Sequence, residues 1–279
     1  MRAEGMKTLR VYLEGVGVWS PSLANVDALR LWLTGRPPIT ANTKPPATIL
    51  PANERRRAPE SVLIAAEVAA QAVAASGRAA STLTCVFASA FGDQTITDYL
   101  CATLAHAPNE LSPTRFHNSV HNAPAGYWTI ATDCQAPSNA VCAGRASFGA
   151  GLLEAATQAC ADEKPVLLVC SDIAGTGPLA EITGCHHAFG CALVLSPKAT
   201  ARGMGSLDLQ LTLAAPSGPD LPADAAAWIA SNPSATALSL LALLANNGSD
   251  CVLAASDQLG LRAHWETTHL KSTHLEGTA

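Results

Sequence analysis

Charged side chains are scarce in this chain. Lysine, arginine, aspartate and glutamate together make up 14% of its 279 residues, whereas hydrophobic residues make up 48%. A disordered chain needs the opposite balance, so the composition predicts a folded protein of one or two domains. The formal net charge is -5, which provides no basic field to collect phosphate groups. The composition therefore argues against a nucleic-acid partner.

Long apolar runs are missing as well. The longest helix-like apolar run covers residues 237–245 and is too short to span a bilayer. Residues 1–20 contain no charged leader followed by a continuous apolar stretch, so we expect neither export nor membrane insertion. Nine cysteines are scattered in an odd number through the chain, which favours a reducing compartment over a disulfide framework. These features predict a cytoplasmic protein.

The sequence does contain a regular alternation of strand-like and helix-like segments. Apolar, strand-like segments occur at 8–20, 83–89, 138–142, 166–171 and 191–196. Helix-like segments lie between them at 26–33, 59–76, 96–104, 118–132 and 147–160. This alternation predicts the α/β class, with right-handed crossovers and a mixed or parallel sheet covered on both faces. The proline-rich stretch at 34–57 is expected to form a long surface loop.

The pattern changes after Pro197. The elements expected there are a strand at 205–213, a helix at 234–246 and a hairpin formed by 250–256 and 261–265. We therefore divide the chain into three parts. These are a first domain at 1–199, a smaller second unit at 200–267 and a frayed polar tail at 268–279.

Glycine-rich and serine motifs in this chain are incomplete. The passage at 144–151 lacks the lysine and the hydroxyl residue of a phosphate-binding loop. Ser147 lacks one of the two glycines that flank a nucleophilic serine, because Arg145 stands there. Asp172 follows the strand-like segment at 166–171 without a partner group, so we interpret it as a structural residue.

Two pairs of histidines are candidates for metal binding. His117 and His121 stand four residues apart, but no glutamate of a zinc hydrolase lies between them. His186 and His187 lie near cysteines but lack a second ligand pair. We therefore expect no metal ion and no cofactor.

The segment at 112–156 has the most specific pattern in the chain. Its features are Asn122, Ala125 and Gly126 in a helix-like stretch, then the turn Ala136, Pro137 and Ser138. This pattern resembles the ketoacyl synthases of the thiolase fold. It is similar in particular to short chain-length-factor-like subunits of aryl polyene, type II fatty acid or polyketide systems. The strings VFASAFGD, DYLCATLA and SPTRFHNSVHNAPAGYW extend the resemblance over most of residues 8–196.

The resemblance places the family's catalytic cysteine at Arg145. A cysteine works there because the following helix lowers its pKa, whereas a guanidinium cannot attack a thioester. Cys142 lies three residues earlier, within or beside the expected strand, where the field of the helix N-terminus is absent. No histidine-containing, glycine-rich motif follows Pro197, so the family's two catalytic histidines are also missing. The resemblance therefore implies an inactive homologue, a pseudoenzyme.

The implied fold is a five-stranded mixed sheet of order 3-2-1-4-5 with a reduced C-terminal half. The strand at 138–142 would lie at the sheet edge and pair with the same strand of a catalytic ketoacyl synthase subunit. An acyl carrier protein would reach the chain through this heterodimer. The residues implied for the interface and the acyl tunnel are Arg115, Phe116, Ser119, Asn122, Ala125, Gly126, Ser138, Asn139, Ala140, Val141 and Cys142, with Phe116 as a tunnel wall.

The implied function is that of a non-catalytic chain length factor, which completes the partner's tunnel for unsaturated or polyunsaturated carrier-bound chains such as aryl polyenes. Two alternatives stay open. One is an interaction or regulatory subunit without effect on chain length, and the other is an independent acyltransferase that uses Cys142.

Overall fold

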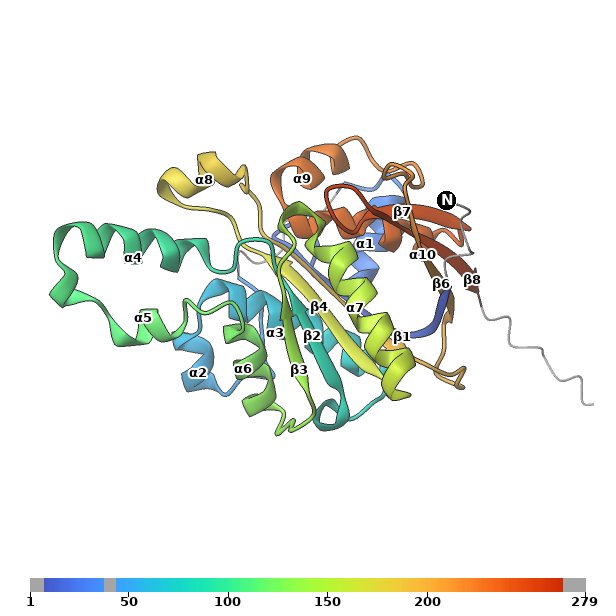
Figure 1. Ribbon diagram of the computed structural model, residues 1–279, viewed down its shortest axis with the longest axis horizontal. Helices are drawn as coiled ribbons and strands as arrows, with labels where there is room; N and C mark the ends of the chain where they lie inside the picture. The colour runs from blue at the N-terminus through green and yellow to red at the C-terminus, as the bar shows by residue number, and fades with distance from the viewer. Residues whose placement is uncertain (1–7, 38–43, 268–279) are drawn as a thin grey trace, which may run out of the picture.

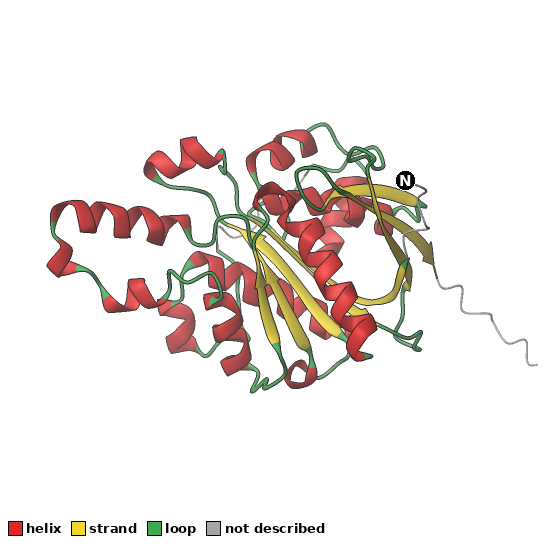
Figure 2. Cartoon of the chain, viewed as in Figure 1, coloured by secondary structure: helices red, strands yellow, loops and turns green. Residues whose placement is uncertain are grey.

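The computed structural model describes residues 8–37 and 44–267. The tail expected at 268–279 lies outside the described residues, as do residues 38–43 of the expected loop. The described chain is built around one sheet of eight strands (Figures 1 and 2). These strands are β1 (Leu9–Trp19), β2 (Thr84–Ala88), β3 (Ser138–Val141), β4 (Val166–Asp172), β5 (Phe189–Ser196), β6 (Gly205–Thr212), β7 (Asp250–Ala254) and β8 (Gly260–Thr267).

The strand order is β3-β2-β4-β5-β1-β6-β8-β7. β2 runs parallel to β3 and β4, and the other neighbouring pairs are antiparallel. The predicted α/β class and mixed sheet are confirmed, but the predicted order 3-2-1-4-5 is wrong. β4 is buried along its whole length and lies beside β2 in the interior of the sheet. β1 is long enough to pair with β5 on one side and with β6 on the other. Strands β6, β8 and β7 therefore continue the sheet beyond β1.

Helices cover both faces of the sheet (Figure 1). One face carries α1 (Val26–Leu33), α7 (Ser147–Asp162), α9 (Ala225–Ser231) and α10 (Leu238–Ala245), whose apolar side chains share one core with the strands. The other face carries α3 (Glu60–Ser76) and α6 (Ala123–Ala131), which form a second core. Helices α4 (Gln94–His106) and α5 (Pro113–His117) project from the body as an arm, and α8 (Gly177–Thr183) projects near it.

Helix α3 packs very closely on β1. A Cβ atom added at Gly15 would lie 2.1 Å from the carbonyl oxygen of Ala72, and one added at Gly17 would lie 2.1 Å from that of Val68. Any larger residue would collide with the helix backbone at these positions. The two glycines of the first strand therefore set the distance between the helix and the sheet.

Most predicted elements are present with shifted ends, but two segments differ. The predicted loop at 34–57 contains a short helix, α2 (Ala52–Arg57). The helix predicted at 118–132 begins only at Ala123, after α5 and a non-helical link. Pro124 explains this start, because proline has no N–H and its ring clashes with the carbonyl group four residues earlier in a helix. Helices α8 and α9, each seven residues long, are too short to give a periodic apolar pattern in the sequence.

The second unit predicted at 200–267 begins with β6, which pairs directly with β1 of the first domain. The boundary at residue 200 stays a prediction. Within the described ranges, no helix combines the length and the apolar character needed to cross a membrane.

Candidate functional site

The elbow (residues 142–147) connects the end of β3 to the start of α7. It contains a 3-10 turn over Gly144–Ala146, in which Gly144 has a φ of +53°. The buried Ser147 hydroxyl donates to the Gly144 carbonyl oxygen at 2.7 Å and accepts from the Ala143 N–H at 3.0 Å. Glycine tolerates the positive φ at no steric cost, so the chain turns sharply from strand to helix here.

Arg145 lies in this turn, directly before α7. Its Nη2 donates to the carbonyl oxygen of Ile229 at 2.9 Å and to that of Ala230 at 2.5 Å. Both carbonyls belong to the last turn of α9, where helix carbonyls lack intrahelical partners and bear partial negative charge. The arginine therefore ties the elbow to a helix of the second unit.

Cys142 stands at the entrance to the elbow. Its exposed side chain donates from Sγ to the Ala90 carbonyl oxygen at 3.2 Å. It precedes the 3-10 turn and stands five positions before the first residue of α7, Ser147. The thiol thus lies away from the amides of the helix N-terminus that would activate it.

Asp172 lies at the end of β4 and is fully buried. Its Oδ1 accepts from the Ser89 hydroxyl at 2.8 Å, from the Ala90 N–H at 2.9 Å and from the Phe91 N–H at 3.2 Å. Its Oδ2 accepts from the Ser234 hydroxyl at 2.6 Å. Burial raises the pKa of this carboxyl group, and the hydrogen bonds oppose the rise. The carboxylate joins the loop after β2 to the second unit, which fits a structural residue.

Asn232 completes this junction from the other side. Its Nδ2 donates to the carbonyl oxygens of Asp172 at 2.9 Å and His187 at 2.7 Å. Its Oδ1 accepts from the backbone N–H groups of Ser234 at 2.8 Å and Ala235 at 3.3 Å, capping the short turn Pro233–Ala237. Sequence reasoning missed Asn232 and Ser234, although an asparagine before a proline is a typical start of a helical turn.

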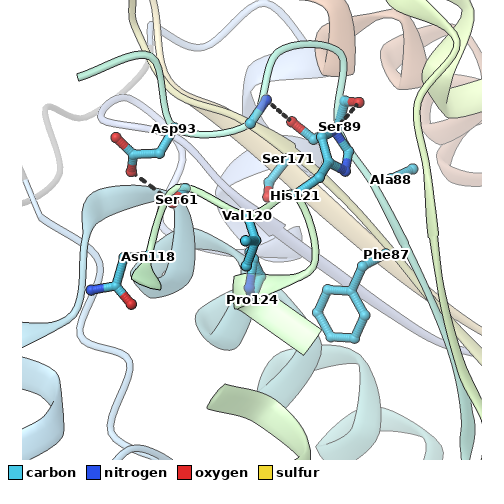
Figure 3. Close-up of a pocket in the computed structure, with 11 residues that line it drawn as sticks. Ser61, Phe87, Ala88, Ser89, Asp93, Asn118, Val120, His121, Pro124 and Ser171 are labelled. Carbon is cyan, nitrogen blue, oxygen red and sulfur yellow. Dashed lines mark hydrogen bonds between the residues drawn. The ribbon is translucent and has the colours of Figure 1, made fainter. Parts of the chain in front are cut away.

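A polar hollow lies beside the carboxyl ends of β2 and β4 (Figure 3). Its serine and carboxylate groups are partly paired: the Ser61 hydroxyl donates to Asp93 Oδ2 at 2.7 Å. His121 Nε2 lies 3.0 Å from the Ser89 carbonyl oxygen. The residues that line the polar hollow are Ser61, Phe87, Ala88, Ser89, Gly92, Asp93, Asn118, Val120, His121, Pro124 and Ser171.

Comparison with known families identifies the chain at this point. The model for the N-terminal domain of beta-ketoacyl synthases matches residues 32–266, which span the elbow, the Asp172 junction and the polar hollow. The chain belongs to this family. A comparison of the sequence with curated proteins finds no match.

Several solved structures resemble this ketoacyl synthase homologue. One is the ketosynthase ApeO in complex with its chain length factor ApeC from Xenorhabdus doucetiae, with a TM-score of 0.69, 21% identity and coverage of 92% of this chain and 99% of that chain. Another is the ishigamide ketosynthase/chain length factor, with a TM-score of 0.66, 14% identity and coverage of 95% and 100%. At these identities the likeness shows a shared fold, the thiolase-like α/β fold.

A third structure is AntDE:AntF, a type II polyketide acyl-carrier protein in complex with its ketosynthase bound to the hexaketide. It has a TM-score of 0.69 and 13% identity, and the match covers 92% of this chain and 99% of that chain. Each of the three matches thus covers more than nine-tenths of this chain.

The homologue presents β3 at the edge of the sheet, as predicted. Ser138, Asn139 and Ala140 are exposed there, and Val141 is half-buried. On one side β3 pairs with β2, and its other side has no strand partner within the described chain. The edge is therefore open to a strand from another molecule.

The other predicted interface residues lie on α5, on α6 and in the link between these helices. On α5, Arg115 and Phe116 are exposed, and the Arg115 guanidinium lies 3.9 Å from the centre of the Tyr99 ring. On α6, Gly126 is exposed, whereas Ala125 packs into the core against α3. Ser119 and Asn122 lie in the link between the two helices. The structure thus places all of these residues except Ala125 at or near the surface.

Among residues 8–37 and 44–267, histidine, cysteine, aspartate and glutamate side chains form no group of three or more that could hold a metal ion.

Proposed function

We propose that this chain is a non-catalytic chain-length-factor subunit, which pairs with an active ketoacyl synthase and completes its acyl tunnel. The observation that carries the proposal is Arg145 in the elbow. A condensing enzyme needs a thiolate at the start of this helix, and here a guanidinium bound to the carbonyls of Ile229 and Ala230 stands there instead. The Arg145 side chain therefore serves a structural contact, and we assign the condensation reaction to the partner subunit.

The open edge of β3 supports the pairing. Three apolar side chains between α5 and the end of α6 are exposed: Phe116 is 60% exposed, Val120 is 50% exposed and Ile130 is 84% exposed. Exposed apolar side chains beside an unpaired strand are typical of a protein interface. The solved structures that share this fold include a ketosynthase in complex with its chain length factor.

The proposed substrate is a growing acyl chain on an acyl carrier protein, which reaches this subunit through the complex. Chains of the aryl polyene type are the proposed class. The arm formed by α4 and α5 projects from the body (Figure 1). Phe116 lies on α5 and is exposed. We assign Phe116 to the wall of the shared tunnel.

Co-expression with its synthase tests the proposal. We expect a stable heterodimer on size-exclusion chromatography, with the condensing activity lost when the partner's cysteine is replaced and retained in Cys142→Ala of this chain. Intact-mass spectrometry after incubation with acyl carrier protein should show no acyl group on Cys142. A soluble monomer acylated at Cys142 would favour the acyltransferase alternative and end the proposal.

Changing the size of the Phe116 side chain is expected to change product length. Phe116→Ala opens the proposed tunnel wall and should shift the product distribution towards longer chains by one or two extension units. Phe116→Trp should shift it towards shorter chains. Product masses from the reconstituted complex measure both effects. Leu213→Ala, at an apolar residue that is 85% exposed on the loop after β6, is the matched control. Unchanged products in both Phe116 variants would support a subunit without effect on chain length.

A further inference from the structure

Helix α5, which carries Phe116, is short and lies outside the apolar cores. It has five residues, and none of their side chains is buried. A helix of this length is unstable in water on its own, because few backbone hydrogen bonds offset the cost of forming its first turn. Contacts from other parts of the chain must therefore hold α5, and with it the Phe116 side chain, in place.

A tyrosine of α4 contacts the first end of α5. Ser112, the N-cap residue of α5, donates its backbone N–H to the Tyr99 hydroxyl oxygen at 3.2 Å. The Tyr99 hydroxyl donates in turn to the Glu110 carbonyl oxygen at 3.4 Å. The Arg115 guanidinium lies over the Tyr99 ring, 3.9 Å from its centre, in a cation–π contact. One side chain of α4 thus contacts residues before, at and within the start of α5.

A tyrosine of α6 contacts the other end of α5. The Tyr127 hydroxyl donates to Oδ1 of Asn118, the C-cap residue of α5, at 3.3 Å. Asn118 is only 4% exposed, and its backbone N–H donates to the Thr114 carbonyl oxygen at 3.1 Å. The Tyr127 ring packs against a small apolar cluster to which α3 and α6 both contribute. This contact therefore connects the end of α5 to the body of the fold.

Phe116 lies between the two tyrosine contacts. Its backbone N–H donates to the Ser112 carbonyl oxygen at 2.9 Å, and its carbonyl oxygen accepts from the Ser119 hydroxyl at 2.8 Å. The ring itself is 60% exposed, so its position depends mainly on the backbone that carries it. Movement of either end of α5 therefore moves the Phe116 ring.

We infer that Tyr99 and Tyr127 are positioning residues, which fix the Phe116 ring in the shared tunnel and so determine how sharply the complex limits product length. The inference rests on the proposed function, in which Phe116 belongs to the tunnel wall. A loosened α5 lets the ring take several positions, so the complex releases chains of several lengths. Loss of a tyrosine hydroxyl broadens the product distribution, whereas a change in the size of Phe116 shifts its centre.

Hydrogen exchange on the full chain alone tests the hold on α5 without the partner. Tyr99→Phe and Tyr127→Phe each remove a hydroxyl and keep the ring. The loss of about one net hydrogen bond corresponds to about twofold to tenfold faster exchange of the Phe116 and Asn118 backbone amides. Tyr12→Phe, in β1 between β5 and β6, is the matched control and should leave both rates unchanged. Unchanged rates in both test variants would overturn the inference.

Product analysis of the complex with the synthase tests the effect on chain length. In Tyr99→Phe and in Tyr127→Phe, the ratio of other lengths to the main product should rise about twofold to tenfold, as the loosened helix becomes more populated. Tyr12→Phe should keep the wild-type distribution. Because Tyr99 acts through the Phe116 ring, Tyr99→Phe should add nothing in the Phe116→Ala background.

The failure of this inference differs from the failure of the proposed function. Unchanged distributions in both tyrosine variants, where Phe116→Ala shifts the product, would overturn the inference alone. Further broadening by Tyr99→Phe in the Phe116→Ala background would also overturn it, because the tyrosine would then act elsewhere. Products that stay unchanged in the Phe116 variants would refute the tunnel wall, and the inference with it.

Discussion

Ala140→Pro is expected to weaken pairing with the synthase while leaving the fold of the chain intact. The Pro137 carbonyl accepts from the Cys85 N–H at 3.0 Å and the Val141 carbonyl accepts from the Ser89 N–H at 3.1 Å. Backbone groups alternate in direction along a strand, so Ala140 directs its N–H away from β2, towards the open edge. Proline removes that donor and none of the bonds to β2. We expect the Kd of the heterodimer to rise at least about tenfold, the loss of about one or two interface hydrogen bonds.

The control for this prediction is Ala140→Ser, which keeps the N–H and the small exposed side chain. Analytical ultracentrifugation measures the Kd of the heterodimer, and thermal unfolding of the isolated chain checks the fold. Equal affinity of the proline variant and the wild type would show that the partner does not pair with β3.

Asp172→Ala is expected to have the largest effect on stability. The carboxylate accepts hydrogen bonds from Ser89, Ala90, Phe91 and Ser234, all at a fully buried position. Alanine would leave these donors without an acceptor and would loosen the junction between the two parts of the chain. We expect the free energy of unfolding to fall by about 3–5 kcal/mol, measured by urea denaturation.

Asp172→Asn is the matched control, because the amide keeps the shape and one acceptor oxygen. Since burial raises the pKa of Asp172, the native chain holds this proton to a higher pH than the unfolded chain does. The contribution of Asp172 to the free energy of unfolding is therefore largest below about pH 4 and falls as the pH rises through the raised pKa. The asparagine variant should lose this pH dependence. A wild-type slope of the opposite sign in that range, absent from the variant, would contradict the argument.

Sequence patterns predicted the elements of the fold better than their arrangement. Apolar runs located the strands of the first domain. The order of the strands depends on contacts between distant segments: Val166 of β4 pairs with Thr84 of β2, 82 positions away by the difference of their numbers. No local pattern encodes such a pairing. The predicted order placed β1 between β2 and β4, whereas in the structure β4 lies directly beside β2 and β1 follows β5.

The candidate site shows the same limit. The resemblance pointed to Arg145 as the residue in place of a nucleophile, but its binding to Ile229 and Ala230 joins segments about 84 residues apart. The polar hollow draws on β2, β4, α3 and the link before α6, segments that only the fold brings together. The sequence shows the residue types of the site, but it does not show which of these residues contact one another.

Strand β1 has a consequence for the order of events during synthesis. Tyr12 pairs with Ser196 in β5 and with Ser206 in β6, so its partners leave the ribosome 184 and 194 residues later by the difference of their numbers. At a translation rate of about 5–20 residues per second, the first strand waits roughly 10–40 s for its neighbours. During that time its apolar side chains and both of its edges have no strand to cover them. The earliest part of the sheet to be made is thus among the last to be protected from aggregation.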